Sequence, residues 1–147
     1  KIILMVPGVS KSGKDKQWSP NNFAKLASLL EKKGYRICVV GQKSDKETVT
    51  TIRSACQQII DLTDKSPPEV IYSVAKKSKF VISNDTGPGH IAALSKSPIL
   101  FLAQDNVISK SNLSEYKHGH YILSDSMEKI SVNYVLDFLN DKKLINK

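Results

Sequence analysis

The sequence predicts an α/β fold, a doubly wound, Rossmann-like parallel sheet of about six strands with helices on both faces. Short apolar runs alternate along the chain with segments whose apolar residues recur at helical spacing. Strands separated by helices indicate βαβ units and therefore a parallel sheet. Crossover connections in such a sheet are right-handed, so the expected strand order is 3-2-1-4-5-6.

The predicted strands are short apolar runs bounded by polar or glycine-containing turns. They lie at residues 2–6, 36–40, 58–60, 80–83, 98–102 and 121–123. Residues 103–120 carry no pattern that assigns them clearly to a helix or a strand.

The first predicted helix starts at Ser19-Pro20, because a serine hydroxyl caps helices and proline suits the first helical position. Gly34 ends this helix. The later helices are expected to start at Ser44 or Asp45, at Pro67-Pro68, after a glycine-rich turn at residues 84–89, and at Ser126. The last of them is expected to end at Leu139.

Length and composition exclude several classes of protein. The 147 residues, 40% apolar and 24% charged, are typical of one globular domain and argue against a disordered chain. No apolar run approaches the roughly 20 residues that span a bilayer. Cys38 and Cys56 lack the spacing of a disulfide framework or a metal site, so we expect free thiols in a reducing cytoplasm.

The chain begins at Lys1 with a strand-like run and no initiator Met, which leads us to expect a domain cut from a longer protein. Its net charge of +8 favours an anionic partner, such as a nucleotide, a phosphorylated sugar, nucleic acid or an acidic membrane face. Aromatic residues are few and form no stacking cluster on the strands, which argues against RNA.

Two unusual loops follow the first and fourth strands, at residues 7–18 and 84–90. In the expected strand order these strands are neighbours at the switch point, where ligands bind outside the carboxyl ends. The fold therefore predicts that both loops meet at one crevice.

The first loop nearly matches a phosphate-binding P-loop at residues 8–15. Asp15 stands where a P-loop needs Ser or Thr to hold Mg²⁺, and the helix signal comes later than Lys14. The loop is then either a flexible basic segment or an anion-binding loop. In the second case Lys11, Lys14 and Lys16 are the candidate phosphate partners, and Trp18 is expected to wedge the loop against the domain.

The second loop, Asp85-Thr86-Gly87-Pro88-Gly89-His90, follows a strand and opens a helix. Its glycines permit close backbone approach, and the first amides of the helix can receive a diphosphate. Asp85 would repel a phosphate unless it binds hydroxyls, a cation or a lysine. Alternatively, Asp85 or Thr86 simply caps the helix, and His90 is either a ligand contact or a polar residue satisfied within the turn.

Asp45 follows the second strand, where an acid often holds ribose hydroxyls, although a helix N-cap is equally compatible with its position. His118 and His120 lack a third ligand at useful spacing, so no metal site is expected.

In combination these residues resemble the bacterial heptosyltransferases of glycosyltransferase family 9, which use ADP-heptose. The resemblance covers roughly residues 3–102. It rests on the motifs Pro7-Gly8, Lys16-x-Trp18-Ser19-Pro20, Val39-Val40-Gly41 with Asp45, Asp61-Leu62-Thr63, and Ser83-Asn84-Asp85-Thr86-Gly87-Pro88-x-His90-x-Ala92.

The resemblance implies that residues 1–147 are the C-terminal, donor-binding domain of a two-domain glycosyltransferase B enzyme. Lys16 would contact the donor phosphates and stabilise the leaving diphosphate, and Asp45 would bind the ribose. Asp85 would contact sugar hydroxyls, and Lys16 and Asp85 are thus the catalytic candidates. The diphosphate would lie against the turn formed by Thr86, Gly87, Pro88 and Gly89, which His90 would support.

The resemblance further implies an inverting transfer of heptose to a lipopolysaccharide core acceptor, without cofactor or metal. The partners would be the nucleotide-sugar donor, a lipid-linked saccharide acceptor and the enzyme's own N-terminal domain, with peripheral contact to the anionic cytoplasmic face of the inner membrane. The general base would belong to the N-terminal domain, so the isolated chain would be inactive.

Two other functions stay open at this point. One is a domain of another nucleotide-sugar enzyme, such as a UDP-sugar transferase or epimerase, and the other is a non-catalytic nucleotide- or RNA-binding module. Asp45 replaces the glutamate usual in the family, Gly89 stands where a larger residue is common, and residues 103–106 lack the family's Gly-x-Thr-x-Pro turn. These departures leave the exact donor open.

Overall fold

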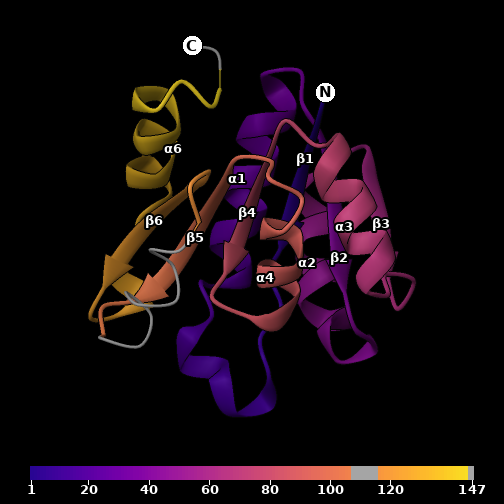
Figure 1. The fold of residues 1–147 in the computed structure, drawn as a ribbon, viewed down its shortest axis with the longest axis horizontal. Helices are drawn as coiled ribbons and strands as arrows, with labels where there is room; N and C mark the ends of the chain where they lie inside the picture. Colours follow the sequence, from indigo (N-terminus) through magenta and orange to yellow (C-terminus); the bar gives the residue numbers. More distant parts are fainter. Residues whose placement is uncertain (107–115, 146–147) are drawn as a thin grey trace.

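The computed structural model describes residues 1–106 and 116–145, which form a six-stranded parallel sheet with helices on both faces (Figure 1). The strand order is β3-β2-β1-β4-β5-β6, as predicted. The strands are β1 (Ile2–Val6), β2 (Arg36–Gly41), β3 (Ile59–Thr63), β4 (Phe80–Asn84), β5 (Ile99–Gln104) and β6 (Gly119–Ser124).

The helices divide between the two faces of the sheet because side chains of a strand point alternately to either side. On one face Ile3 and Met5 pack with α1 (Pro20–Lys32), α2 (Lys46–Ala55) and α6 (Val132–Asp141). On the other face Leu4 and Val6 pack with α3 (Pro68–Lys77) and α4 (Gly87–Ala93). Three 3-10 turns complete the described elements, namely η1 (Lys11–Lys16), η2 (Lys43–Asp45) and η3 (Met127–Lys129).

The structure corrects several predicted boundaries. Strand β5 runs to Gln104, β6 starts at Gly119, α4 starts at Gly87 within the predicted turn 84–89, and the last helix ends at Asp141 and not at Leu139. The third strand runs over Ile59–Thr63 and not over residues 58–60. The last helix does not start at residue 126, because η3 comes first and the Ser131 hydroxyl then accepts a hydrogen bond from the Tyr134 N–H to cap α6. The unassigned stretch 103–120 contributes the end of β5 and the start of β6, and its residues 107–115 lie outside the described part.

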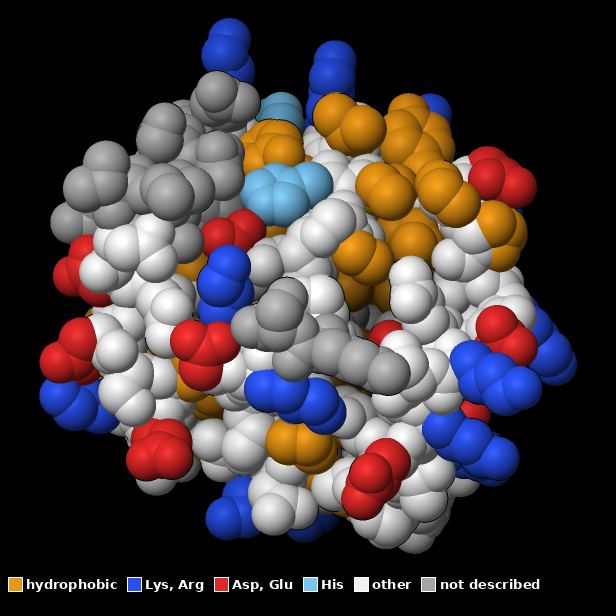
Figure 2. Space-filling view, turned by 90° about the horizontal axis from the view of Figure 1, so that it is seen from below, with side chains coloured by type: hydrophobic (Ala, Val, Ile, Leu, Met, Phe, Trp, Pro, Cys, Tyr) orange, Lys and Arg blue, Asp and Glu red, His pale blue; other side chains and the backbone are white. Residues whose placement is uncertain are grey.

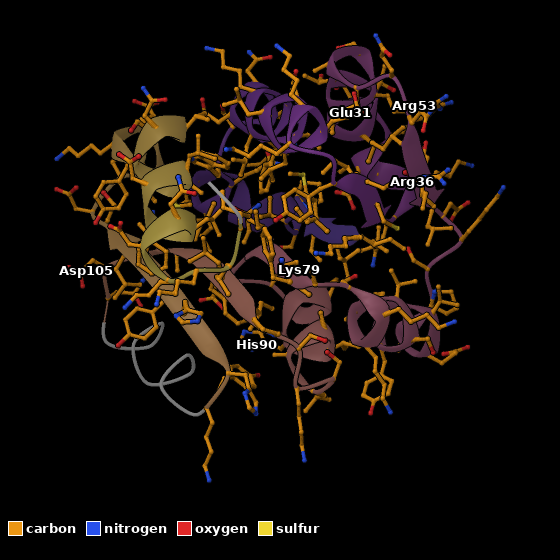
Figure 3. All side chains as sticks on the ribbon, turned by 90° about the horizontal axis from the view of Figure 1, so that it is seen from above. Glu31, Arg36, Arg53, Lys79, His90 and Asp105 are labelled. Atoms are coloured by element: carbon orange, nitrogen blue, oxygen red, sulfur yellow. The ribbon has the colours of Figure 1, made fainter. Side chains whose placement is uncertain are left out.

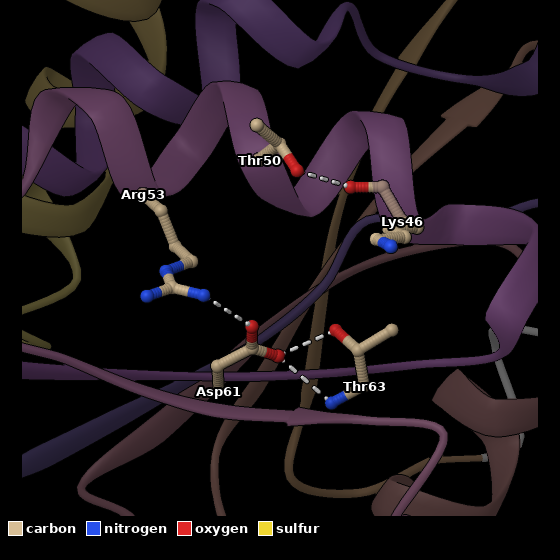
Figure 4. A network of polar contacts seen from close by, with 5 residues as sticks. All are labelled: Lys46, Thr50, Arg53, Asp61 and Thr63. Atoms are coloured by element: carbon tan, nitrogen blue, oxygen red, sulfur yellow. Dashed lines mark hydrogen bonds and ion pairs between the residues drawn. The ribbon is translucent and has the colours of Figure 1, made fainter.

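The edge strand β3 is tied to α2 through Asp61 (Figure 4). The Asp61 carboxylate accepts hydrogen bonds from the Thr63 N–H (2.9 Å) and hydroxyl (2.5 Å) and from Arg53 (3.3 Å). Partial burial raises the pKa of Asp61, but the bonds from Thr63 and Arg53 outweigh it, so the pKa lies below its ordinary value. This strand therefore has a charged anchor on its outer side.

Both cysteines are free thiols, as predicted. Burial raises the pKa of Cys38, in β2, and of Cys56, after α2, to about 11. Both thiols are therefore protonated at neutral pH.

The amino edge of the sheet carries half of the basic residues of the chain. Helices end and strands begin at this edge, and basic residues favour helix C-termini; Arg36 and Lys79 are labelled there in Figure 3. We call the following residues the basic edge: Lys1, Lys32, Lys33, Arg36, Lys76, Lys77, Lys79, Lys96, Lys117, Lys142 and Lys143. Only Glu31 and Asp141 are acidic among the described residues at the same helix ends.

Candidate functional site

A cavity of about 740 Å³ opens at the carboxyl ends of β1, β2 and β4, between the two loops that the sequence singles out. Figure 2 looks onto this edge of the sheet and shows acidic and basic side chains interspersed, with a group of hydrophobic side chains at the upper right. Six of the predicted site residues line the cavity, namely Lys16, Asp45, Asp85, Thr86, Gly87 and Pro88. The predicted meeting of the two loops is therefore confirmed.

Asn84, the last residue of β4, holds the two loops together. Its side-chain amide donates to the Pro7 carbonyl (2.8 Å), and its side-chain oxygen accepts from the Trp18 N–H (3.0 Å). Asn84 is fully buried, so these bonds replace water that cannot reach it. Sequence reasoning missed this role, although a polar residue at the end of a buried strand is a signal for one.

The first loop forms the 3-10 turn η1 and does not have the geometry of a P-loop. Helix α1 starts at Pro20, well after Lys14, so its N-terminus does not point at Gly13 and Lys14. Trp18 is fully buried and its Nε1 donates to the Ile130 carbonyl (2.7 Å), which confirms the predicted wedge.

Among the lysines of this loop, Lys16 lines the cavity and Lys14 does not. Both are exposed. The side chain of Lys11 lies outside the described residues. The structure thus favours Lys16 as the cation that reaches a ligand in the cavity.

The second loop shapes the wall of the cavity through Thr86 and Gly87 at the start of α4, whereas Gly89 does not line it. The Thr86 hydroxyl accepts from the Gly89 N–H (3.4 Å), so Thr86 is the N-cap, one of the two alternatives from the sequence. A Cβ on Gly87 would meet nothing within 4 Å, which leaves the mouth of the cavity open. Gly89 instead faces the protein interior, where a Cβ would overlap the Ser83 hydroxyl.

Asp85 does not cap the helix; it pairs with His90 one turn later. The Asp85 carboxylate lies 2.8 Å from His90 Nε2, and His90 Nδ1 lies 2.6 Å from the Tyr116 hydroxyl. This pairing gives the carboxylate beside the cavity a structural partner, which the sequence alone did not identify. Neither His90 nor Gly89 lines the cavity, so their predicted part in ligand binding stays a prediction.

Asp45 is the N-cap residue of α2 by position, and it also lines the cavity. Its Oδ2 accepts from the Gln42 N–H (2.8 Å) and so closes the turn η2, whereas its side chain makes no capping hydrogen bond to α2. The capping alternative therefore holds for the position of Asp45 and not for its side chain. The carboxylate lies so close to Gly8 that a Cβ there would come within 2.5 Å of Oδ2. The second alternative, contact with ribose hydroxyls, stays a prediction.

The residues of the opposite wall of the cavity were not among those predicted from the sequence. Gln42 and Ser44 precede α2, Ser66 precedes α3, and all three line the cavity with polar side chains. The Ser66 hydroxyl donates a hydrogen bond to the Leu62 carbonyl (3.0 Å). Only the register of β2 and β3 brings these turns beside the first loop.

Within residues 1–106 and 116–145, no group of three or more His, Cys, Asp and Glu side chains is arranged to hold a metal ion. His118 is exposed. His120 packs its ring edge-on against Phe138, and burial, followed by the charge of Lys142, lowers its pKa.

Comparison with known proteins assigns the family. Residues 1–103 match the family described as glycosyltransferase family 9 (heptosyltransferase). The chain belongs to glycosyltransferase family 9. The match includes both loops and the N-terminus of α4, so every predicted site residue lies inside it.

This family 9 chain is 30% identical over 102 residues to lipooligosaccharide heptosyltransferase 2 of Haemophilus ducreyi, which covers 66% of this chain and 29% of that protein. It is 29% identical over 115 residues to lipopolysaccharide heptosyltransferase 3 of Escherichia coli, which covers 72% of this chain and 33% of that protein. The chain thus spans about a third of the length of these relatives.

Two solved structures share the fold of this family 9 chain. The structure of E. coli ADP-heptose LPS heptosyltransferase II matches with a TM-score of 0.82 at 22% identity, over 95% of this chain and 45% of that one. E. coli heptosyltransferase WaaC with ADP-2-deoxy-2-fluoro heptose matches with a TM-score of 0.82 at 20% identity, over 96% and 43%.

Proposed function

We propose that this chain binds ADP-heptose in the cavity and forms the donor-binding part of an enzyme that transfers heptose, with inversion, to a lipopolysaccharide core acceptor. The observation that carries the proposal is the meeting of Lys16, the N-terminus of α4 and Asp85 at one cavity. Family membership supports the same donor, as do the two similar structures, one an ADP-heptose LPS heptosyltransferase and the other a heptosyltransferase with ADP-2-deoxy-2-fluoro heptose.

Each part of the cavity suits a different part of that donor. Lys16 and the first amides of α4 offer positive charge to a diphosphate. Asp45 accepts hydrogen bonds from ribose hydroxyls, and Asp85 accepts them from hydroxyls of the sugar. Chain geometry supports this division, because Asp45 follows β2 and Asp85 follows β4.

In the proposed reaction an acceptor hydroxyl attacks the anomeric carbon, the bond to the diphosphate breaks, and ADP leaves. Negative charge develops on the leaving diphosphate, where Lys16 and the amides stabilise it without a metal. We expect the general base and the acceptor site in the part of the enzyme that faces this cavity. The isolated 147-residue chain should therefore bind donor but not turn it over.

Calorimetric titration with ADP, UDP, GDP and ADP-heptose, with and without Mg²⁺, tests the proposal. We expect metal-independent binding of ADP and tighter binding of ADP-heptose. Lys16→Ala should weaken the binding of ADP and of ADP-heptose about tenfold, equivalent to about 1.4 kcal/mol. Lys25→Ala, at an exposed position of α1, is the control and should leave both affinities unchanged. Asp85→Ala should weaken ADP-heptose more than ADP. Equal losses for the two ligands, or a preference for UDP, would contradict the assignment.

We also propose that the basic edge contacts anionic lipid of the cytoplasmic membrane face. No helix in the described ranges is long and apolar enough to span a bilayer. Each lysine near an anionic lipid surface contributes about 1 kcal/mol to the free energy of membrane binding. The fraction of the protein that sediments with phosphatidylserine vesicles should fall when Lys32, Lys33, Lys76 and Lys77 are changed to Gln. Binding that ignores both salt and these substitutions would refute the contact.

A further inference from the structure

A chain of polar contacts runs from the cavity to the start of β6. It passes from the Asp85 carboxylate to His90 Nε2 (2.8 Å) and from His90 Nδ1 to the Tyr116 hydroxyl (2.6 Å). Asp85 faces the cavity, whereas His90 and Tyr116 do not line it. Tyr116 also lies beyond residues 1–103, to which the family match extends.

The protons of this chain follow from what each group can donate. An ionised carboxylate only accepts hydrogen bonds, so a neutral His90 must carry its proton on Nε2. Its Nδ1 is then an acceptor, and the Tyr116 hydroxyl donates to it. Tyr116 thereby favours the one neutral tautomer that presents an N–H to Asp85.

Packing holds the rings in this geometry. His90 stacks on Phe101 with a centroid distance of 5.2 Å, and Tyr116 stacks on the same phenylalanine at 5.8 Å. Gly119 lets the turn close against Tyr116, because a Cβ at Gly119 would lie 2.9 Å from the Tyr116 Cβ. The Gly119 N–H bonds to the Tyr116 carbonyl (3.1 Å).

We infer that Tyr116 is a positioning residue for donor binding, which acts through His90 to hold the Asp85 carboxylate toward the sugar. The inference rests on the proposed function only for the identity of that sugar donor. Without the hydroxyl, His90 Nδ1 loses its hydrogen-bond donor, and the ring is held less firmly against the Asp85 carboxylate.

The contact itself is tested without any ligand. Long-range ¹H–¹⁵N spectra of the histidine rings should show a hydrogen-bonded, unprotonated Nδ1 for His90, and Tyr116→Phe should move that resonance downfield. Tyr134→Phe, at an exposed tyrosine of α6, is the matched control and should leave it in place. A His90 spectrum unchanged by Tyr116→Phe would overturn the inference.

The consequence is tested by calorimetry with the same variants. Tyr116→Phe should weaken ADP-heptose binding about fivefold, the equivalent of one hydrogen bond of about 1 kcal/mol, and change ADP binding less than twofold. A changed spectrum with an unchanged preference for ADP-heptose over ADP would reject the positioning role. Failure of the wild-type chain to bind ADP-heptose would count against the proposed function, while the spectra would still decide whether the contact exists.

Discussion

At the scale of single residues, the site depends on side chains that no ligand needs to touch. Asn84 is fully buried, and its side chain bonds to one backbone group at each end of the first loop, the Pro7 carbonyl and the Trp18 N–H. The amide side chain both donates to a carbonyl and accepts from an N–H. Neither an ionised Asp, which cannot donate, nor Leu, which can do neither, could replace it.

Asn84→Ala should lower the free energy of unfolding by about 2 to 4 kcal/mol, because it leaves the Trp18 N–H and the Pro7 carbonyl without partners. Urea unfolding measures the loss. Asn133→Ala, at an exposed position of α6, is the control and should stay within about 0.5 kcal/mol of the wild type. A loss below about 1 kcal/mol in Asn84→Ala would mean that water replaces the amide.

Among individual residues, the sequence predicted those whose chemistry is local. Trp18 as a wedge and Thr86 as a cap both follow from short patterns, and the structure confirms them. The pairing of Asp85 with His90 required the pitch of α4, and the contact of Tyr116 required the path of a segment that carried no pattern. Such partners depend on tertiary geometry and are invisible in the order of residues.

At the scale of elements, α4 shows why two glycines two positions apart in one motif are not equivalent. Gly89 packs against β4 and β5, with the Asn84 carbonyl oxygen and Phe101 Cε1 each 3.0 Å from the place of a Cβ. Gly87 faces open space. The close approach of this helix to the sheet therefore needs only Gly89.

Gly89→Ala should destabilise the protein by about 1 to 3 kcal/mol through overpacking. Gly87→Ala should be neutral or stabilising by up to about 1 kcal/mol, because alanine favours helix. Thermal unfolding of the two variants side by side checks the pair. The opposite order would show that α4 moves freely over the sheet.

Glu31 joins two elements by its charge. It lies near the end of α1 and accepts from the N–H groups of Gln57 and Gln58 (2.9 and 3.0 Å), which lead into β3. These two hydrogen bonds lower the pKa of Glu31 from its ordinary 4.5. The carboxylate thus stabilises the fold above that pH, and the contribution is lost as the pH falls through the lowered value.

Urea unfolding of wild type and Glu31→Gln at several pH values should reveal this contribution. The wild type should be the more stable at pH 7, and the difference should shrink toward zero as the pH falls through the lowered pKa of Glu31, below which both side chains are neutral. Glu128→Gln, at an exposed position in η3, serves as the control. A difference that persists unchanged at pH 3 would assign the effect to shape and not to charge.

Element boundaries were predicted best where a local cap marks them. Ser19 and Pro20 define the start of α1, whereas the last helix was misplaced because Ser126 and Ser131 are both plausible caps. Only Ser131 bonds to a helical N–H, since η3 packs Met127 and Ile130 into the core first. Where two serines could each cap a helix, the burial of the apolar residues between them determines which one does.

At the scale of the whole molecule, charge and ligand site lie at opposite edges of the sheet. The basic edge holds 11 of the 22 Lys and Arg residues, and only two of the 14 acidic residues share those helix ends. The rest of the sequence is close to neutral. The expectation that the net charge of +8 reflects an anionic ligand therefore applies to few of the basic residues. The parallel direction of the strands, which the sequence predicts, places the basic edge away from the cavity.

Salt should consequently affect ADP binding through Lys16 and not through net charge. The two edges are separated by the length of the strands, roughly 17 Å for five residues, about twice the screening length of about 8 Å at physiological salt. Changing Lys32, Lys33, Lys76 and Lys77 to Gln should leave the Kd for ADP within about twofold. Lys16→Gln should both weaken binding and flatten its dependence on salt. A large change in the quadruple variant would show that the remote charges steer the ligand.

Trp18, the single tryptophan of the chain, allows both unfolding and ligand binding to be followed by fluorescence. Its indole is fully buried, its ring N–H bonds to the Ile130 carbonyl before α6, and its backbone N–H bonds to Asn84 beside the cavity. Intrinsic fluorescence excited at the indole band therefore reports from the junction of three distant segments. A red shift of the emission would signal release of the C-terminal segment, and a change of intensity at constant wavelength would signal occupation of the cavity, without any added label.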